Sequence, residues 1–157
     1  MDSVAKGPDS PPAGDRCETA VQLFREGCSC SQAILTAFAD SAGMDRESAL
    51  RVASGFGGGM ARLGRTCGAV TGGIMALGLK HGAEVAGSEE AKVRFYERVR
   101  RFVSEFEAGH GSSECRTLLG VDIGTSEGMS RAREQKLFAT QCAGYVRTAA
   151  EVLAGML

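Results

Sequence analysis

Cysteine is the residue type in this 157-residue chain that is best suited to chemistry, and the chain has six cysteines. A thiolate attacks disulfides, and it is the soft ligand that iron–sulfur clusters and zinc prefer. The spacing of the cysteines matches neither the C-x-x-C of thioredoxin-like proteins nor the paired knuckles of a zinc ribbon. Any shared site must therefore be assembled by the fold from distant cysteines.

Three of the cysteines fall at the starts of predicted helices. Cys30 follows Ser29 and Cys67 follows Thr66, and both Ser29 and Thr66 can cap a helix. Cys115 comes shortly after a pair of serines that can cap a short turn. Unpaired backbone N–H groups and the helix macrodipole favour a thiolate over a thiol at such a position. Cys30 and Cys67 are therefore the candidate catalytic thiolates, and neighbouring arginines would strengthen the effect if they face the sulfur.

The remaining cysteines have weaker signals. Cys142 lies on an apolar helix face and points inward, so a core role and a site role are equally open. Cys28 precedes Cys30 in the segment GCSC and could resolve a mixed disulfide, whereas Cys17 is a weaker candidate. Buried cysteine is also common as a small hydrophobe, so a purely structural role is the alternative for any single one.

Neither histidine is expected in the site. His81 ends the predicted helix that starts next to Cys67, so the two are too far apart to share a metal ion, and His81 supplies charge at the helix end. His110 is expected to be a solvated loop residue. The loop Gly55–Gly59 matches no phosphate-binding pattern, and we expect it to bring backbone close to the cysteine centre.

Helical spacing of apolar residues and capping residues recur along the chain, and no stretch alternates as a half-buried strand does. The expected helices span residues 15–27, 29–43, 45–52, 66–82, 88–109 and 130–157, with a short turn at 112–119. Gly68, Gly72 and Ala76 would line one face and let a neighbouring backbone pack closely. The sequence predicts an all-α fold, a compact multi-helix bundle around this central glycine-rich helix.

The composition is that of one globular domain, with 43% hydrophobic residues, 24% charged residues and a net charge of -1. Without a basic excess, nucleic acid and membrane surfaces are not expected as partners. All three prolines lie in residues 1–14, which we expect to be a disordered leader before a single domain over residues 15–157. No signal sequence and no apolar stretch of membrane-spanning length is visible, so a cytoplasmic location is expected.

Four segments together resemble a known family. GCSCSQAILTAF, ASGFGGGMARLGRTCGAVTGGIMALGLKHG, ECRTLLG and a late cysteine follow one another in the order of the redox-active family named for the cysteine pattern C_GCAxxG_C_C. The resemblance covers about residues 17–150 and assigns the family's cysteines to Cys30, Cys67, Cys115 and Cys142. The family is similar to the iron–sulfur-like part of split-Soret cytochromes, which implies a metal site.

Three hypotheses follow. In the first, the four cysteines of the family pattern converge and bind an iron–sulfur cluster or zinc, or cycle between thiol and disulfide. In the second, a metal-free oxidoreductase uses Cys30 or Cys67 as attacking thiolate, with a redox partner protein or a small thiol as its counterpart. In the third, the chain is a non-catalytic helical interaction module with buried structural cysteines, and helix 88–109 is its partner or homodimer surface.

Overall fold

The computed structural model describes residues 15–157, and the predicted leader at residues 1–14 lies outside the described residues. The regular elements of the described part are all helices, and its only β-type pairing is an isolated bridge between Thr66 and Glu114. The α-helices are α1 (Arg16–Arg25), α2 (Cys30–Ala39), α3 (Arg46–Ala53), α4 (Gly68–His81), α5 (Glu89–His110), α6 (Cys115–Leu119), α7 (Ser126–Glu134) and α8 (Ala143–Ala154). The all-α prediction is therefore confirmed.

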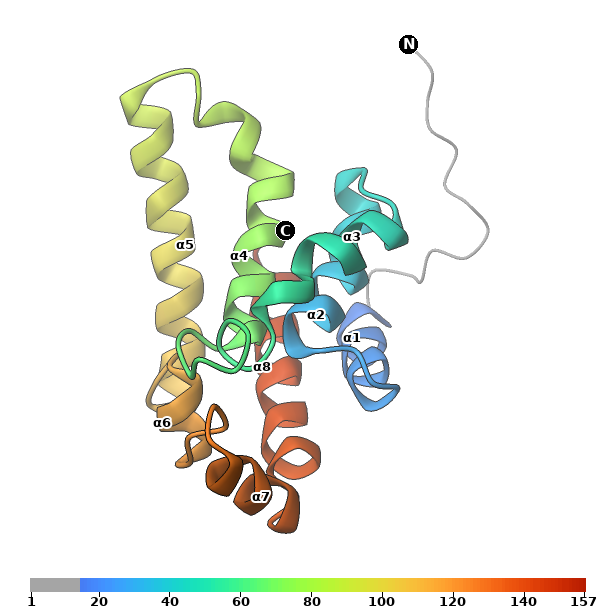
Figure 1. Cartoon of the computed structure of the whole chain (residues 1–157). Coiled ribbons are helices and arrows are strands. Elements are labelled where there is room, and N and C mark those ends of the chain that lie inside the picture. The colour runs from blue at the N-terminus through green and yellow to red at the C-terminus, as the bar shows by residue number, and fades with distance from the viewer. Residues whose placement is uncertain (1–14) are drawn as a thin grey trace.

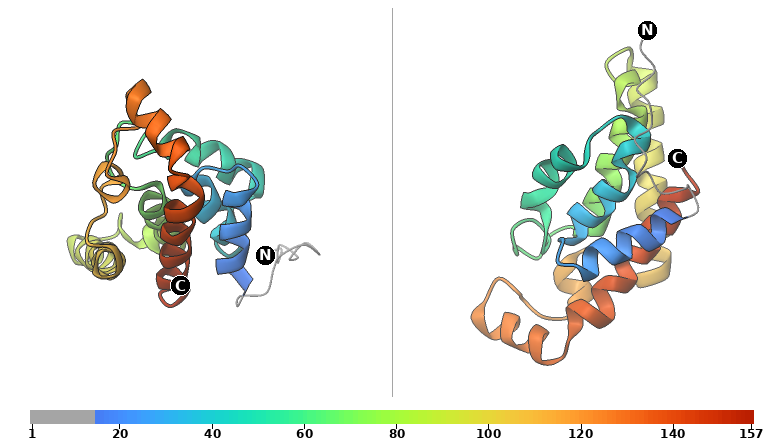
Figure 2. Two further views of the ribbon diagram at one scale, coloured as in Figure 1. Left: turned by 90° about the horizontal axis from the view of Figure 1, so that it is seen from below. Right: turned by 90° about the vertical axis from the view of Figure 1, so that its right-hand side faces the viewer.

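Helix α4 is the centre of the bundle. It packs against α2, α5 and α8, while α1 packs against α2 and α8. Figure 2 shows α8 running between α1 and α5. The connection between α4 and α5 forms one end of the molecule, and α6 and α7 lie at the opposite end (Figure 1). The predicted central glycine-rich helix is thus confirmed, and so is the bundle around it.

Glycines on α4 let two neighbours approach closely. A Cβ at Gly72 would lie 2.8 Å from the Ser31 carbonyl oxygen of α2, and a Cβ at Gly68 would lie 3.0 Å from the Ser31 nitrogen. On another side of α4, a Cβ at Gly73 would collide with the ring of Phe102, a fully buried residue of α5. The small residues therefore bring the start of α4 directly against the start of α2, where Cys30 lies.

Several predicted helix starts are confirmed by their caps. Ser29 and Gln32 form a capping box, in which the Ser29 side chain accepts from the Gln32 N–H and the Gln32 side chain accepts from the Ser29 N–H. Asp45 caps α3, and Ser88 caps α5. These motifs are local, so the sequence alone was enough to find them.

Other predicted boundaries were wrong. Asp15 makes no side-chain cap, because its backbone is already helical. Thr66 does not cap α4, which begins at Gly68 with Cys67 at the cap position, because Thr66 pairs with Glu114 instead. The expected helix 130–157 is interrupted: α7 ends at Glu134, Lys136 has a left-handed backbone (φ +53°), and a π-helical segment, Phe138–Cys142, precedes α8.

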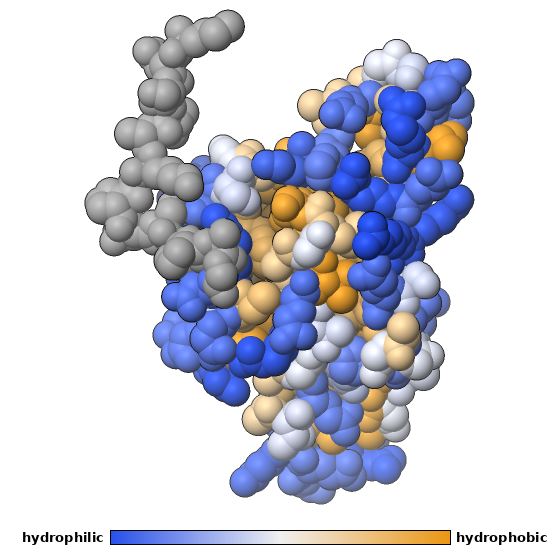
Figure 3. All heavy atoms as spheres, turned by 180° about the vertical axis from the view of Figure 1, so that it is seen from behind, coloured by the Kyte–Doolittle hydropathy of each residue, from blue (hydrophilic) through white to orange (hydrophobic). Residues whose placement is uncertain are grey.

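Helix α5 buries only part of its apolar residues. Phe102 and Phe106 are fully buried, but Val93 and Tyr96 are 46% and 50% exposed near the start of the helix. Seen from behind, apolar residues reach the surface among hydrophilic ones (Figure 3). No helix among residues 15–157 is long and apolar enough to cross a bilayer. The interaction surface predicted on this helix stays a prediction.

Candidate functional site

Four of the six cysteines line one pocket of about 660 Å³. Cys30 is the first residue of α2, Cys67 immediately precedes α4, Cys115 is the first residue of α6 and Cys142 ends the π-helical segment before α8. These are the four cysteines that the family pattern assigns. They come from segments that lie far apart in the sequence, from Cys30 to Cys142. The structure brings them together, while their catalytic and ligand roles stay predictions.

The four thiols are largely shielded from water. Cys67, Cys115 and Cys142 are buried, Cys30 is partly exposed, and all of them are free thiols. Three of them respond to the charge of another, since a thiolate at Cys142 opposes ionisation of Cys30, Cys67 and Cys115. The cluster therefore resists carrying several negative charges at once unless a cation compensates them.

Cys30 and Cys142 affect each other's ionisation. The Cys30 thiol is hydrogen-bonded to Cys142, which holds the pKa of Cys30 well above its ordinary value, and burial adds to this. The same hydrogen bond lowers the pKa of Cys142, against the effect of its burial. This hydrogen bond therefore favours the thiolate form at Cys142 and the thiol form at Cys30.

Cys67 and Cys115 favour the thiol form. Burial raises the pKa of Cys67 to about 11, although the backbone N–H groups of Ala69 and Val70 act in the opposite direction. Burial also raises the pKa of Cys115 to about 12, with contributions from Cys67 and Cys142. The pKa directions thus run against the expectation that helix starts favour thiolates at Cys30, Cys67 and Cys115. The hydrogen bond to Cys142 is the main cause at Cys30, and burial is the main cause at Cys67 and Cys115.

A backbone bridge fixes Cys67 beside Cys115. The Cys67 N–H donates to the Ser113 carbonyl at 2.7 Å, and the Cys115 N–H donates to the Arg65 carbonyl at 2.7 Å. This is the isolated bridge around Thr66 and Glu114, and it joins two segments far apart in the sequence. Two of the thiols are thus held by main-chain hydrogen bonds rather than by side-chain packing alone.

The loop after α3 makes one turn of left-handed helix next to these cysteines. Five consecutive residues, Gly58 to Arg62, have φ between +48° and +68°, and three of them are not glycine. A left-handed conformation costs a non-glycine residue about 1–2 kcal/mol. The turn passes so close to the site that a Cβ at Gly59 would lie 2.7 Å from Cβ of Cys115. The predicted close approach of this loop to the cysteine centre is confirmed, and its strain is typical of functional segments.

The π-helical segment places Cys142. The wider turn holds residues Phe138–Cys142, and one turn later the Tyr145 hydroxyl donates to the Leu118 carbonyl of α6 at 2.9 Å. Burial raises the pKa of Tyr145, and the cysteines of the cluster add to this. Single π turns inside helices often occur at functional sites. No sequence signal marks this one, since the apolar spacing reads as a continuous α-helix.

The other sequence candidates lie outside the pocket. Neither Cys17 nor Cys28 is among its lining residues, and burial together with Glu151 raises the pKa of Cys17. His110 is not a solvated loop residue: it ends α5, its Nε2 is 2.8 Å from Oγ1 of Thr148, and its ring stacks edge-on against Tyr145. It nevertheless stays outside the site, as expected.

Beyond the cysteines, the pocket has an apolar wall and two arginines, Arg62, which precedes Cys67 and was among the arginines expected near the thiols, and Arg133, which sequence reasoning missed. The wall comes from α1, α6, α7 and their flanking loops, and its large apolar members are Phe24, Leu118, Leu119, Ile123, Met129 and Phe138. Arg62 and Arg133 also line the pocket and have exposed side chains. Arginines were expected to act on the thiols, but Arg116 instead pairs with Asp122 at 3.2 Å.

No three His, Cys, Asp or Glu side chains between residues 15 and 157 form a closed set of ligands around one ion. The donor chemistry nevertheless fits a thiophilic group, because four cysteine thiols and no carboxylate are among the side chains that line the described pocket. The sequence matches the family model described as putative redox-active protein (C_GCAxxG_C_C) over residues 28–156. Comparisons with curated proteins and with solved structures gave no match.

Proposed function

The chain belongs to the redox-active protein family named for the C_GCAxxG_C_C pattern, and from this premise we propose that Cys30, Cys67, Cys115 and Cys142 are its redox centre. In this proposal the four sulfur atoms bind a thiophilic metal group, an iron–sulfur cluster in the first place and zinc in the second. The observation that carries it is the convergence of four cysteines from four separate segments on one pocket. When bound, an iron–sulfur cluster would supply a one-electron carrier.

The electrostatics of the pocket support a cationic occupant. Burial and mutual repulsion oppose the ionisation of Cys67 and Cys115. A metal ion removes that obstacle, because it compensates the thiolate charges as the protons leave. The pocket also has more room than a single four-coordinate ion requires, which favours a polynuclear cluster over zinc.

The protein's own residues would hold and shield this centre. The bridge between Thr66 and Glu114 fixes the backbone of two ligands, and the Tyr145–Leu118 hydrogen bond ties the segment of Cys142 to α6. Apolar side chains around the sulfur atoms keep water away, which raises the influence of each remaining polar group on the potential of the centre. We propose a cytoplasmic setting, with a redox partner protein or a small thiol as the counterpart.

A specific observation favours a second candidate, thiol–disulfide exchange at the hydrogen-bonded pair Cys30 and Cys142. The thiolate of Cys142 would attack a disulfide substrate and release one thiol. The sulfur of Cys30 would then attack Cys142, forming a protein disulfide and releasing the second thiol. Two protein thiols are oxidised and one substrate disulfide is reduced. Cys142 is the attacking thiol here, whereas Cys30 or Cys67 was expected from the sequence.

The test is anaerobic purification of the full chain, followed by iron, sulfide and zinc analysis, a visible spectrum and a free-thiol count. We expect a coloured, iron-containing protein that loses its metal in Cys67→Ser and keeps it in the matched control Cys28→Ser, whose thiol lies outside the pocket. A colourless protein with a disulfide-forming pair selects the exchange chemistry instead. Metal content and reactivity that are indifferent to Cys67 and Cys142 would leave only the interaction module.

A further inference from the structure

The pocket extends beyond the cysteines, and its outer part has a chemistry that sulfur ligation does not use. Two cationic side chains, Arg62 and Arg133, line it together with large apolar residues. They come from separate elements, Arg62 from the left-handed turn and Arg133 from the last turn of α7. A void of about 660 Å³ is in the range of pockets that enclose small organic ligands.

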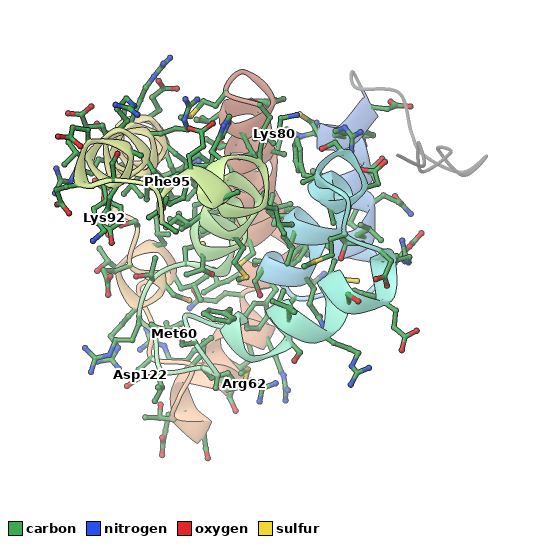
Figure 4. The ribbon with its side chains drawn as sticks, turned by 90° about the horizontal axis from the view of Figure 1, so that it is seen from above. Met60, Arg62, Lys80, Lys92, Phe95 and Asp122 are labelled. Carbon is green, nitrogen blue, oxygen red and sulfur yellow. The ribbon has the colours of Figure 1, made fainter. Side chains whose placement is uncertain are left out.

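Neither arginine is paired with a carboxylate in the part of the chain that the structure describes. Among residues 15–157, no ion pair involves Arg62 or Arg133. Asp122, which lies on the same side of the view as Arg62 in Figure 4, is paired with Arg116 at 3.2 Å. No described Asp or Glu lines the pocket. An anion in the pocket would therefore meet two positive charges and no competing carboxylate on its walls.

The position of Arg62 is built into the backbone. It ends the left-handed turn at φ +64°, and its N–H donates to the Gly57 carbonyl at 3.2 Å. A Cβ at Gly124 would lie 2.9 Å from the Arg62 carbonyl oxygen, so the loop before α7 packs directly on this residue. The strained turn thus packs against the loop that leads into α7, the helix of Arg133, and this contact holds Arg62 at the pocket.

We infer that the outer part of the cysteine pocket binds a small organic anion, whose carboxylate or phosphate group contacts Arg62 and Arg133 and whose apolar body lies against the wall that includes Leu118 and Met129. The bound molecule would have its other end directed at the sulfur atoms. This names the substrate class of the redox centre and rests on the proposed function only for the reaction, since binding itself requires no metal.

The test uses two fluorescent probes with the same aromatic body, anionic anilinonaphthalene sulfonate and neutral phenylnaphthylamine, titrated against the full chain. We expect Arg62→Gln and Arg133→Gln each to weaken binding of the anionic probe about fivefold, as loss of one ionic contact at a partly exposed site does. Binding of the neutral probe should change by less than about twofold. The matched control is Arg131→Gln, which removes the same charge from the same helix outside the pocket and should affect neither probe.

Displacement of the anionic probe by benzoate or by phenyl phosphate then identifies the acid group that the site prefers. Equal effects of Arg131→Gln and Arg133→Gln, equal effects on the two probes, or no displacement by either acid would overturn the inference. Circular dichroism of each variant verifies the fold. Because the metal content is measured on the same samples, a metal-free protein that still distinguishes the probes would refute the proposed metal centre and leave the anion site standing.

Discussion

Two neighbouring regions of the molecule, the crossing of α2 and α4 and the backbone around the cysteines, are built in contrasting ways. Along the crossing of α2 and α4, regular helices meet at small residues, and Gly72 contacts the backbone of Ser31. Around the cysteines, the backbone is irregular: a left-handed turn at 58–62, an isolated bridge at Thr66, and a π-helical segment before α8. The regular helices form a rigid frame, and the irregular segments between them position the cysteines around one pocket.

The comparison also shows where strain is kept. The three non-glycine residues of the left-handed turn together store several kcal/mol, on the order of 3–6 by the usual cost per residue. Such a segment persists only when the surrounding structure determines its shape. The helix crossing supplies this support, since α2 begins at Cys30 and α4 begins directly after Cys67.

The largest effect is expected at the crossing itself. Gly72→Val would place side-chain atoms where a Cβ already lies 2.8 Å from the Ser31 carbonyl oxygen, in a fully packed interface. We expect the free energy of unfolding to fall by about 3 kcal/mol, the upper part of the range for overpacking. Urea denaturation followed by circular dichroism measures it. In the control Gly78→Ala on the same helix, the new Cβ meets no atom within 4 Å, so a gain of about 0.5–1 kcal/mol is expected instead.

A smaller loss of stability with a larger loss of function is expected in the irregular part. Gly59→Ala combines a left-handed φ of +68° with contacts of 2.6 Å to the Arg65 nitrogen and 2.7 Å to Cβ of Cys115. We expect about 2 kcal/mol of destabilisation and displacement of Cys115 from the pocket. The change should therefore lower metal content or pocket-thiol reactivity in a protein that still folds.

The control for that variant is Gly111→Ala, which has φ +81° and no atom within 4 Å of the new Cβ. It isolates the cost of the left-handed backbone, about 1 kcal/mol, and should leave the cysteines unaffected. If Gly59→Ala and Gly111→Ala had the same stability and the same metal content, the close approach of the turn to Cys115 would not matter for function.

The regular half of this comparison could be predicted from the sequence because its signals are local. The Ser29–Gln32 capping box fixed the start of α2, and the spacing of Gly68 and Gly72 identified the close helix crossing. The family pattern selected the four cysteines that line the pocket, although nothing in the spacing alone would have separated Cys30 from Cys28.

The irregular half could not be predicted, because long-range contacts impose it. Gly58 and Gly59 marked the loop, but Met60 and Lys136 have positive φ although neither residue type favours it, so the sequence showed neither the continuation of the left-handed turn nor the break after α7. Thr66 has a good capping side chain, but the bridge to Glu114 takes its place in the structure. The thiol pKa directions also depend on burial, which outweighs the helix-start effect that local sequence suggests.

The smallest effect on stability is expected at the contact between α5 and α8, where His110 of α5 contacts Thr148 and Tyr145 of α8. Burial lowers the pKa of His110, so the folded protein takes up a proton at this ring less readily than the unfolded chain does. Stability is therefore complete above the unfolded pKa of about 6.5 and declines as the pH falls below it towards the folded value. Urea unfolding curves recorded between pH 7.5 and 5 measure how steeply the free energy of unfolding falls with pH, and the loss of stability should be recovered when the pH is raised again.

His81 contributes in the same direction, since burial lowers its pKa too, with Arg98 adding to the effect. We expect His110→Gln to remove one part of the slope and His81→Gln the other, while the double variant is flat in this window. A slope that is unchanged in the double variant would assign the acid sensitivity to other groups. A slope carried by His110 alone would locate the acid sensitivity at the contact between α5 and α8, where the ring of His110 packs edge-on against Tyr145, a residue that lines the cysteine pocket.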